Sequence, residues 1–334
     1  MSKVTIYDVA REAGVSASTV SRAFSRPGRV SNATAQRIRQ VAEELGYRAE
    51  PMVVTPAVSR QRTRTIGLAV SDITNPFYFG IIRGAEKGAV ALDRSVMLVD
   101  TQESESLERS ILNRTLPLID GLVIASSRVD DTKLRQMAKE IPVMMLNRVV
   151  QGLPSIIPDS ARGMRRAVEH LTSLGHRAIW YAAGPEASWA DGARYRAFRE
   201  AAHELVFAEH RIGPFQPTLA GGAKAADVLL ERGATAVVAY NDLMALGMMR
   251  RLRERGVDIP GEISIVGFDD SFGSDLVTPR LTTVAAPLVR LGELAMVNVV
   301  AMTEGKQWRG SEPIVVPVAF RERESTAPPR PTSA

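Results

Sequence analysis

A single predicted helix near the start of the chain carries short polar side chains and one arginine. The residues that it exposes over 17–24 are Ala17, Ser18, Thr19, Ser21 and Arg22. Hydroxyl groups and a bidentate guanidinium near a helix N-terminus suit hydrogen bonds to base edges and phosphates in the major groove of DNA. An ordinary small helical bundle can contain the same pattern, so the elements that position these residues must be considered with them.

These residues lie in the second of three consecutive helical patterns. The first is capped by Thr5, with Asp8 in the capping-box position. Ser16 caps the second after a three-residue turn, and Ser31 opens the third. Small residues at the crossing of the first two helices allow a close and steep approach, which predicts a helix-turn-helix over 10–24.

The positive charge of the chain is concentrated at its start. The whole sequence carries a net charge of +5, but residues 1–65 hold eleven Lys and Arg against five acids, which gives +6 there and −1 elsewhere. Concentrated positive charge favours a polyanionic partner, because neutralised phosphates release their condensed counterions. A solvated basic surface is the alternative; the agreement between charge, turn and third helix favours DNA.

The remainder of the chain alternates apolar runs with helical patterns. The runs begin at positions 66, 95, 121, 142, 178, 236 and 264. They are too hydrophobic for half-exposed strands, which predicts parallel sheets with helices on both faces. Roughly 260 residues exceed one such unit. The expected fold class is therefore an α/β core of two doubly wound parallel-sheet lobes, preceded by a small all-α headpiece.

Polar residues directly after the apolar runs are candidate ligand contacts, because the carboxyl ends of parallel strands meet at one edge of a sheet. Arg148, Asn241 and Asp269 stand in such positions. Phe77 and Tyr78 follow the first strand and suit either the wall of a pocket or the core. A ligand-binding cleft between the two lobes is the expected site.

Three carboxylates near strand ends have structural alternatives. Asp242 is expected to cap the helix that follows it. For Asp159, a cap of the next helix and a ligand contact are both open, and a cap or hinge role stays open for Asp269. A further helix is expected to begin near Ser188, which places Arg194 one to two turns inside it.

The headpiece resembles that of the lactose-repressor (LacI/GalR) family of bacterial transcriptional regulators. The resemblance rests on the motifs TIYDVAREAGVSASTVSRAF and RVSNATAQRIRQVAEELGY. It continues through HLTSLGHRAIWYAAGP and YNDLMALGMMRRLRERGVDIPGEISIVGFDD and covers the chain from about Val4 to Arg323. It implies a homodimeric repressor that binds a palindromic operator, with a periplasmic-binding-protein-like core that takes a small effector between its lobes.

The resemblance also implies roles for individual headpiece residues. Ala17, Ser18 and Arg22 are expected to read bases, and Arg22 suits guanine. The residues expected to hold phosphates are Tyr7, Ser16, Thr19, Ser21, Ser31 and Thr34. Thr5 and Tyr47 complete the expected DNA-binding set.

In the core, the resemblance implies that Arg194, Asn241 and Asp269 hydrogen-bond the effector. The expected wall is completed by Arg148, Phe77, Tyr78 and Trp189. A guanidinium, an amide and a carboxylate together suit vicinal hydroxyls, so a sugar, polyol or nucleoside is expected. Whether the effector releases the protein from DNA or promotes binding stays open.

The hinge departs from the family pattern. Related proteins place a short helix after the headpiece and wedge one of its leucines into the minor groove, but Pro56 stands where that leucine is expected. A proline inside a helix begun at Pro51 costs about 3 kcal/mol. A shifted helix, with Thr55 as cap and Val58 as wedge, and a flexible tether over 49–64 are both open.

The expected domain bounds follow from these patterns. They are a headpiece over 1–48, a hinge over 49–65, an N-lobe over 66–157 with 286–317, a C-lobe over 158–285 with 318–324, and a disordered tail over 325–334. The chain ends without an apolar heptad, which favours a dimer over a tail-assembled tetramer.

Other classes of function find little support. The chain has no Cys, its four His lack metal-ligand spacing, and it contains no phosphate-binding or nucleophile-elbow motif, so no metal, cofactor or catalytic residue is expected. The start shows no apolar targeting segment, which predicts a cytoplasmic protein with no membrane partner. A solute-binding protein or an α/β enzyme on the same scaffold are the alternatives, and the basic headpiece argues against both.

Overall fold

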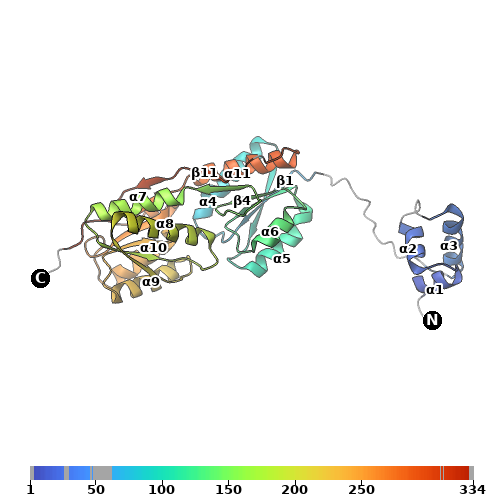
Figure 1. Ribbon diagram of the computed structural model, residues 1–334, viewed down its shortest axis with the longest axis horizontal. Helices are drawn as coiled ribbons and strands as arrows, with labels where there is room; N and C mark the ends of the chain where they lie inside the picture. The colour runs from blue at the N-terminus through green and yellow to red at the C-terminus, as the bar shows by residue number, and fades with distance from the viewer. Residues whose placement is uncertain are drawn as a thin grey trace. The chain divides into compact units, whose positions relative to one another are not determined.

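Figure 1 shows the computed structural model of the chain. It describes residues 4–25, 30–45, 47, 62–308, 310 and 312–330, without the side chains of Ser21, Arg22, Ser25 and Asn32. The chain divides into two compact units, Met1–Gln61 and Arg62–Ala334. Each unit is described by itself.

The smaller unit contains three helices, as the sequence predicts: α1 (Ile6–Glu12), α2 (Ala17–Ser25) and α3 (Asn32–Glu44). The Thr5 N–H donates to Asp8 Oδ2 at 2.9 Å, which forms the predicted cap. Ser16 and Ser31 accept from the third N–H of their helices at 3.2 and 3.3 Å. The helices enclose a core of small and branched apolar residues that includes Val9, Val20 and Ile38. The first two helices with their tight turn therefore form a helix-turn-helix.

The larger unit contains two six-stranded sheets. The first has the order β11-β5-β4-β3-β1-β2 and is parallel throughout. Its strands are β1 (Thr65–Val70), β2 (Ser95–Asp100), β3 (Gly121–Ala125), β4 (Val143–Leu146), β5 (Ser155–Pro158) and β11 (Ile314–Val316). The second has the order β12-β10-β9-β8-β6-β7, and only β12 runs antiparallel to its neighbour among the described strands. Its strands are β6 (Ala178–Ala182), β7 (Ala208–Ile212), β8 (Ala236–Ala239), β9 (Ser264–Asp269), β10 (Thr282–Ala285) and β12 (Ala319–Arg321).

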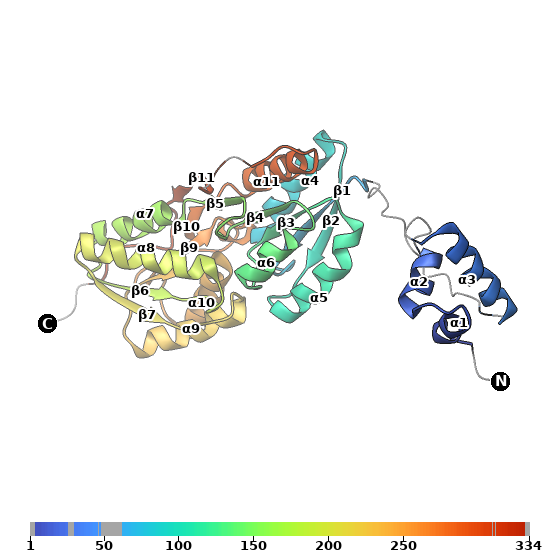
Figure 2. The same ribbon diagram turned by 45° about the vertical axis from the view of Figure 1, so that its right-hand side comes forward.

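Helices cover both faces of each sheet, which defines two doubly wound lobes (Figures 1 and 2). In the N-lobe, α4 (Phe77–Ala91) and α11 (Leu288–Thr303) cover one face, and α5 (Glu105–Thr115) and α6 (Asp131–Met137) cover the other. In the C-lobe, the pairs are α7 (Ser160–Ser173) with α8 (Trp189–Leu205) and α9 (Leu219–Glu231) with α10 (Asp242–Glu254). The short 3-10 helices are η2 (Leu116–Leu118) and η3 (Phe272–Asp275).

The apolar runs are continuous because both faces of their strands are buried. In β3, Leu122 and Ile124 pack under α5 and α6, whereas Val123 and Ala125 pack under α4 and α11. Since successive strand residues point to opposite faces, a strand between two helical layers needs an apolar residue at every position.

Glycines let the helices of each lobe approach closely. A methyl group on Gly84 of α4 would lie 1.9 Å from the carbonyl oxygen of Val289 in α11, and one on Gly292 would lie 2.2 Å from that of Ile81. Both views show α4 and α11 side by side (Figures 1 and 2). Any larger side chain at Gly84 therefore forces these two helices apart.

The described part of the C-terminal tail is ordered, so the expectation of disorder over 325–334 is wrong for 325–330. Ser325 is fully buried and donates to the Ile265 carbonyl at 2.5 Å. The Ala327 N–H donates to Ser264 at 3.0 Å, and its carbonyl lies 3.0 Å from Nε2 of the buried His176. Polar residues of β9 and of the helix-strand turn thus hold a segment whose composition alone suggests disorder. Residues 331–334 lie outside the described residues.

The last residues of the expected hinge are bound to the N-lobe. The Asp120 carboxylate accepts from the N–H and hydroxyl of Thr63 at 2.9 and 3.1 Å and from the N–H of Arg64 at 2.8 Å. Pro56 and Val58 lie outside the described residues, so the alternatives for the hinge stay predictions. Among the helices that the structure describes, none is both long and apolar enough to cross a membrane.

The close contact between α4 and α11 makes Gly84 sensitive to substitution, whereas Gly192, in an open part of α8, serves as the control. Gly84→Ala is expected to lower the free energy of unfolding by about 1–3 kcal/mol, because the methyl group meets backbone atoms. Gly192→Ala, in α8, meets nothing within 4 Å and is expected to be neutral or to stabilise by up to ~1 kcal/mol through helix propensity. Urea unfolding of both variants measures the difference, and equal stability of the two would contradict the close packing.

Candidate functional site

The two sheets direct their strand ends toward one small, partly open pocket of about 20 Å³ between the lobes. The N-lobe contributes Asn75, Phe77, Tyr78, Glu103, Ser126 and Asn147. The C-lobe contributes Arg194, Pro217, Tyr240, Asn241 and Asp269. The pocket therefore collects aromatic, amide and charged groups from eight separate segments, as ligand sites at strand ends do.

Several pocket residues have a strained backbone. Ser126 and Asn147, directly after β3 and β4, have φ angles of 61° and 58°, and Glu103, three residues beyond β2, has a φ of 56°. Asp269, at the end of β9, has a φ of 111°. Left-handed conformations cost a residue with a Cβ about 1–2 kcal/mol each and concentrate at functional sites. These backbone conformations direct four polar side chains toward the same pocket.

Arg194 and Asp269 form the charged centre of the C-lobe side. Arg194 is 2% exposed, and its Nη2 donates to Asp269 Oδ1 at 3.0 Å. Its Nη1 donates to the Tyr240 carbonyl, and its guanidinium lies 4.1 Å and 5.1 Å from the ring centroids of Phe268 and Tyr240. Its Nε is buried without a partner among the described residues. Two hydrogen bonds and two rings thus fix the guanidinium and leave its Nε–H unused.

Burial raises the pKa of Asp269 to about 6, against the opposing charge and hydrogen bond of Arg194. The carboxylate is therefore mainly ionised at neutral pH and holds Arg194 as an ion pair. The helix that carries Arg194 begins as predicted, since the Ser188 hydroxyl accepts from the Asp191 N–H at 3.2 Å.

Asn241 caps α10, because its Oδ1 accepts from the Met244 N–H at 3.0 Å. The prediction that Asp242 caps this helix is wrong, because the cap is the residue before it. The Asp242 carboxylate instead accepts from the Ser271 N–H at 2.6 Å and from the Thr283 hydroxyl at 2.5 Å. It supports the strained turn that follows β9. Asp159 does cap α7, by accepting from the N–H of Arg162 at 3.0 Å.

The two aromatic residues at the start of α4 serve both pocket and core. Phe77 and Tyr78 are 4% and 3% exposed, line the pocket and belong to the N-lobe core. Their rings meet edge to face with centroids 5.0 Å apart. Burial raises the pKa of Tyr78, so its hydroxyl stays neutral and can donate.

Arg148 does not line the pocket, contrary to the prediction. Its Nη1 donates to the carbonyls of Ser127 and Val129, both at 2.8 Å, and its Nη2 pairs with Asp131 at 2.7 Å. The left-handed backbone of Asn147 places the asparagine in the pocket and turns the next residue away.

Trp189 is half-buried and is also absent from the pocket lining. It lies five residues before Arg194 on α8, and with 3.6 residues per turn the two side chains leave the helix in different directions. The predicted residues that the structure brings together are Phe77, Tyr78, Arg194, Asn241 and Asp269.

Sequence reasoning missed six lining residues. They are Asn75, Glu103, Ser126, Asn147, Pro217 and Tyr240. Ser126 and Asn147 directly follow β3 and β4, so the strand-end rule used for Asn241 would have found them. Glu103 lies three residues beyond β2 and gave no comparable signal.

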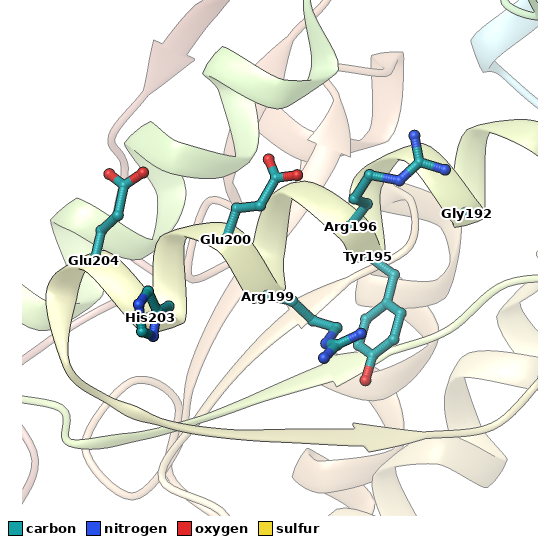
Figure 3. Close-up of a pocket in the computed structure, with 7 residues that line it drawn as sticks. All are labelled: Gly192, Tyr195, Arg196, Arg199, Glu200, His203 and Glu204. Carbon is teal, nitrogen blue, oxygen red and sulfur yellow. The ribbon is translucent and has the colours of Figure 1, made fainter.

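A second hollow, of about 600 Å³, lies along α8 (Figure 3). Its residues, from Gly192 to Glu204, all come from this one helix. Two of the charged side chains are paired outside it, Arg199 with Glu209 at 3.4 Å and Glu204 with Arg165. This open surface does not collect groups from several elements, so the pocket between the lobes is the candidate site.

In the smaller unit, the structure places several predicted DNA contacts on the surface. Tyr7 is 72% exposed, and the Ser16 hydroxyl lies 2.9 and 2.8 Å from those of Ser18 and Thr19. Thr5 and Ser31 are exposed, whereas Ala17 and Thr34 are half-buried. Tyr47 is half-buried, with its ring centroid 6.2 Å from that of Phe24. The side chains of Ser21 and Arg22, and all of Val58, lie outside the described residues.

A helix-turn-helix unit joined to a two-lobed α/β unit with a polar pocket between its lobes defines the class of ligand-responsive DNA-binding regulators. Comparison with known proteins agrees with this class. Residues 5–50 match the bacterial regulatory proteins of the lacI family, and residues 168–326 match the periplasmic binding protein-like domain.

Individual relatives extend the likeness over the whole chain. The HTH-type transcriptional regulator DegA of Bacillus subtilis is 33% identical, with 98% of this chain and 99% of DegA covered. A lac repressor dimer bound to operator and the anti-inducer ONPF superposes with a TM-score of 0.70 at 28% identity, over 98% of this chain and 100% of that one. A lacI-family regulator of Enterococcus faecium with bound ribose gives a TM-score of 0.70 at 32% identity, over 79% and 99%.

The chain belongs to the lacI family of bacterial regulatory proteins. It is a DNA-binding transcriptional regulator and not an enzyme, as the sequence predicts.

Asp242 makes the stability of the protein depend on pH. Burial, with a smaller contribution from Asp269, raises the pKa of Asp242 to about 8 from 3.8. Between these values the folded state holds a proton that the unfolded state releases, so this group lowers the free energy of unfolding as the pH rises, by up to about 1.4 kcal/mol per pH unit.

Asp242→Asn removes this titration, and its amide can still accept from the Ser271 N–H and donate to the Thr283 hydroxyl. The stability of the variant relative to the parent chain should therefore rise between pH 5 and 8 in urea unfolding. Parallel pH profiles for the two proteins would contradict a buried, protonated Asp242.

Proposed function

We propose that the chain binds a palindromic operator as a homodimer and that a small, polar, uncharged effector in the pocket between the lobes controls this binding. The observation that carries the proposal is the buried Arg194–Asp269 pair, which lines one pocket together with Asn241, Phe77 and Tyr78.

The chemistry of the pocket suits a sugar, a polyol or a nucleoside. Asp269 supplies acceptor oxygens, while Arg194 Nε and the amide nitrogen of Asn241 supply donors. Vicinal hydroxyls both donate and accept, so they match this set, and aromatic rings pack against the apolar face of such a ligand. The ribose in the similar Enterococcus faecium regulator supports the same class of ligand.

The proposal for DNA rests on the headpiece. Its helix-turn-helix exposes hydroxyl groups at the start of α2, and residues 1–65 carry a net charge of +6. A recognition helix lies in the major groove with its N-terminal residues near the bases, and two copies related by a twofold axis read two half-sites.

The proposal of a homodimer is supported by apolar side chains that the single chain leaves exposed. Phe272 and Leu276, in or next to η3, are 74% and 67% exposed, and Phe79 of α4 is 50% exposed. Phe272 and Leu276 lie four residues apart in one segment, and clustered apolar exposure is typical of protein interfaces. The similar lac repressor structure is described as a dimer bound to operator.

Control of DNA binding requires that the effector prefer one arrangement of the lobes. Screening of sugars, polyols and nucleosides by thermal shift, followed by operator binding with and without each ligand found, tests the proposal. A ligand that stabilises the protein and leaves operator affinity unchanged would contradict it.

Arg194→Lys is expected to abolish the effector response while leaving operator affinity within about twofold. A lysine keeps the charge but cannot bond Asp269 and the Tyr240 carbonyl together, nor supply the Nε donor. Effector titrations followed by operator fluorescence anisotropy measure both properties. Arg196→Lys, an exposed position on the same helix, is the matched control and should respond as the parent does.

Tyr7→Phe is expected to weaken operator binding by about tenfold, since a hydrogen bond to a charged phosphate is worth roughly 1.5 kcal/mol. The loss should be similar for all operator sequences, because a phosphate contact carries no base information. Gln36→Ala, on the exposed side of α3, serves as the control. A sequence-dependent loss in Tyr7→Phe would assign Tyr7 to the bases instead.

A further inference from the structure

Glu103 gives the N-lobe side of the pocket a fixed carboxylate. Arg128 Nε donates to its Oε2 at 2.7 Å, and Arg128 Nη2 forms an ion pair with the same oxygen at 2.5 Å. The two side chains are 19% and 6% exposed. Both bonds from Arg128 go to the same oxygen, and Oε1 has no hydrogen-bond partner in the described part of the chain.

The backbone around this pair is also fixed. Gln102 and Glu103 both adopt left-handed φ angles, of 49° and 56°, and the Glu103 N–H donates to the Ser71 carbonyl at 2.6 Å. On the other side, Nη1 of Arg128 donates to the Ser126 carbonyl at 3.1 Å. The backbone N–H of Arg128 donates to the Glu108 carboxylate at 2.9 Å. The Glu103 carboxylate therefore cannot turn away from the pocket without breaking several bonds.

The pocket thus has a carboxylate on each lobe. Glu103 lines it from the N-lobe, and Asp269 lines it from the C-lobe. The nearby guanidinium groups of Arg128 and Arg194 already bond these two carboxylates. An anionic ligand would face two acidic groups in a partly desolvated space and would have to compete for both arginines.

We propose that Glu103 is a specificity-determining residue of the pocket: it accepts a hydroxyl hydrogen bond from an uncharged polyhydroxy effector and excludes ligands that carry a carboxylate or a phosphate. This inference rests on the proposed function of the pocket as an effector site and narrows the ligand class to neutral compounds.

Matched neutral and anionic ligands test the inference by calorimetry on the full chain. The pairs are D-ribose with D-ribose 5-phosphate, D-galactose with D-galacturonate, D-glucose with D-glucuronate, and adenosine with AMP. The parent chain should bind the neutral member of at least one pair, and about tenfold or more tightly than its anionic partner. Glu103→Gln should weaken the neutral ligand about tenfold and narrow this preference, because an amide removes the charge and one acceptor oxygen.

Two further variants keep the test decisive. Glu86→Gln removes an exposed carboxylate on α4 and should leave the preference unchanged. Glu103→Asp keeps the charge beside Arg128 but shortens the reach, so it should lose neutral affinity and still reject the anions. It provides the measurement if Glu103→Gln fails to fold, which far-UV circular dichroism would show.

The outcomes distinguish the role of Glu103 from the proposed function of the pocket. If the parent chain binds a neutral sugar and its anionic partner equally, or if Glu103→Gln leaves their ratio unchanged, the role of Glu103 is overturned and the effector site stands. If the parent chain binds none of the neutral ligands, the proposed function fails and the role of Glu103 fails with it.

Discussion

The parallel direction of the strands is the constraint on which the rest of the larger unit depends. Parallel strands end at the same edge of a sheet, so each lobe brings its strand ends to one side. A pocket lies there between the two lobes, and Ser126, Asn147, Tyr240 and Asp269 line it from the ends of β3, β4, β8 and β9. The cost of this arrangement is visible as left-handed backbone at Glu103, Ser126, Asn147 and Asp269.

Each buried charge in the pocket is paired with an opposite charge from the same lobe. Arg194 holds Asp269 in the C-lobe, and Arg128 holds Glu103 in the N-lobe. Each pair is close to neutral overall, which limits the desolvation penalty that an isolated charge would carry. Because each carboxylate is bound mainly through one oxygen, each keeps acceptor capacity for a ligand. The same two pairs therefore keep charged groups in the pocket and leave acceptor oxygens that face it.

Much of the fold follows from periodicity and capping. The continuous apolar runs indicated strands covered on both faces, and Thr5, Ser16 and Ser31 marked the starts of the first three helices. The strand-end rule found Asn241 and Asp269, but it chose Arg148 over Asn147, since a left-handed residue reverses which of two neighbours faces the pocket. Tertiary contacts decided the rest. The position of the Glu103 carboxylate depends on its ion pair with Arg128, and the ordered conformation of the tail at Ser325 depends on its hydrogen bond to β9. In both cases the partner is distant in sequence.

The chain passes between the lobes three times, after β5, after β10 and after β11. Neither lobe is therefore a continuous segment, and α11, which closes one face of the N-lobe core, lies more than 100 residues beyond β5. During synthesis the helix-turn-helix is complete long before either lobe can be. A chain that stops before α11 would thus carry a complete helix-turn-helix without a complete N-lobe beside the pocket.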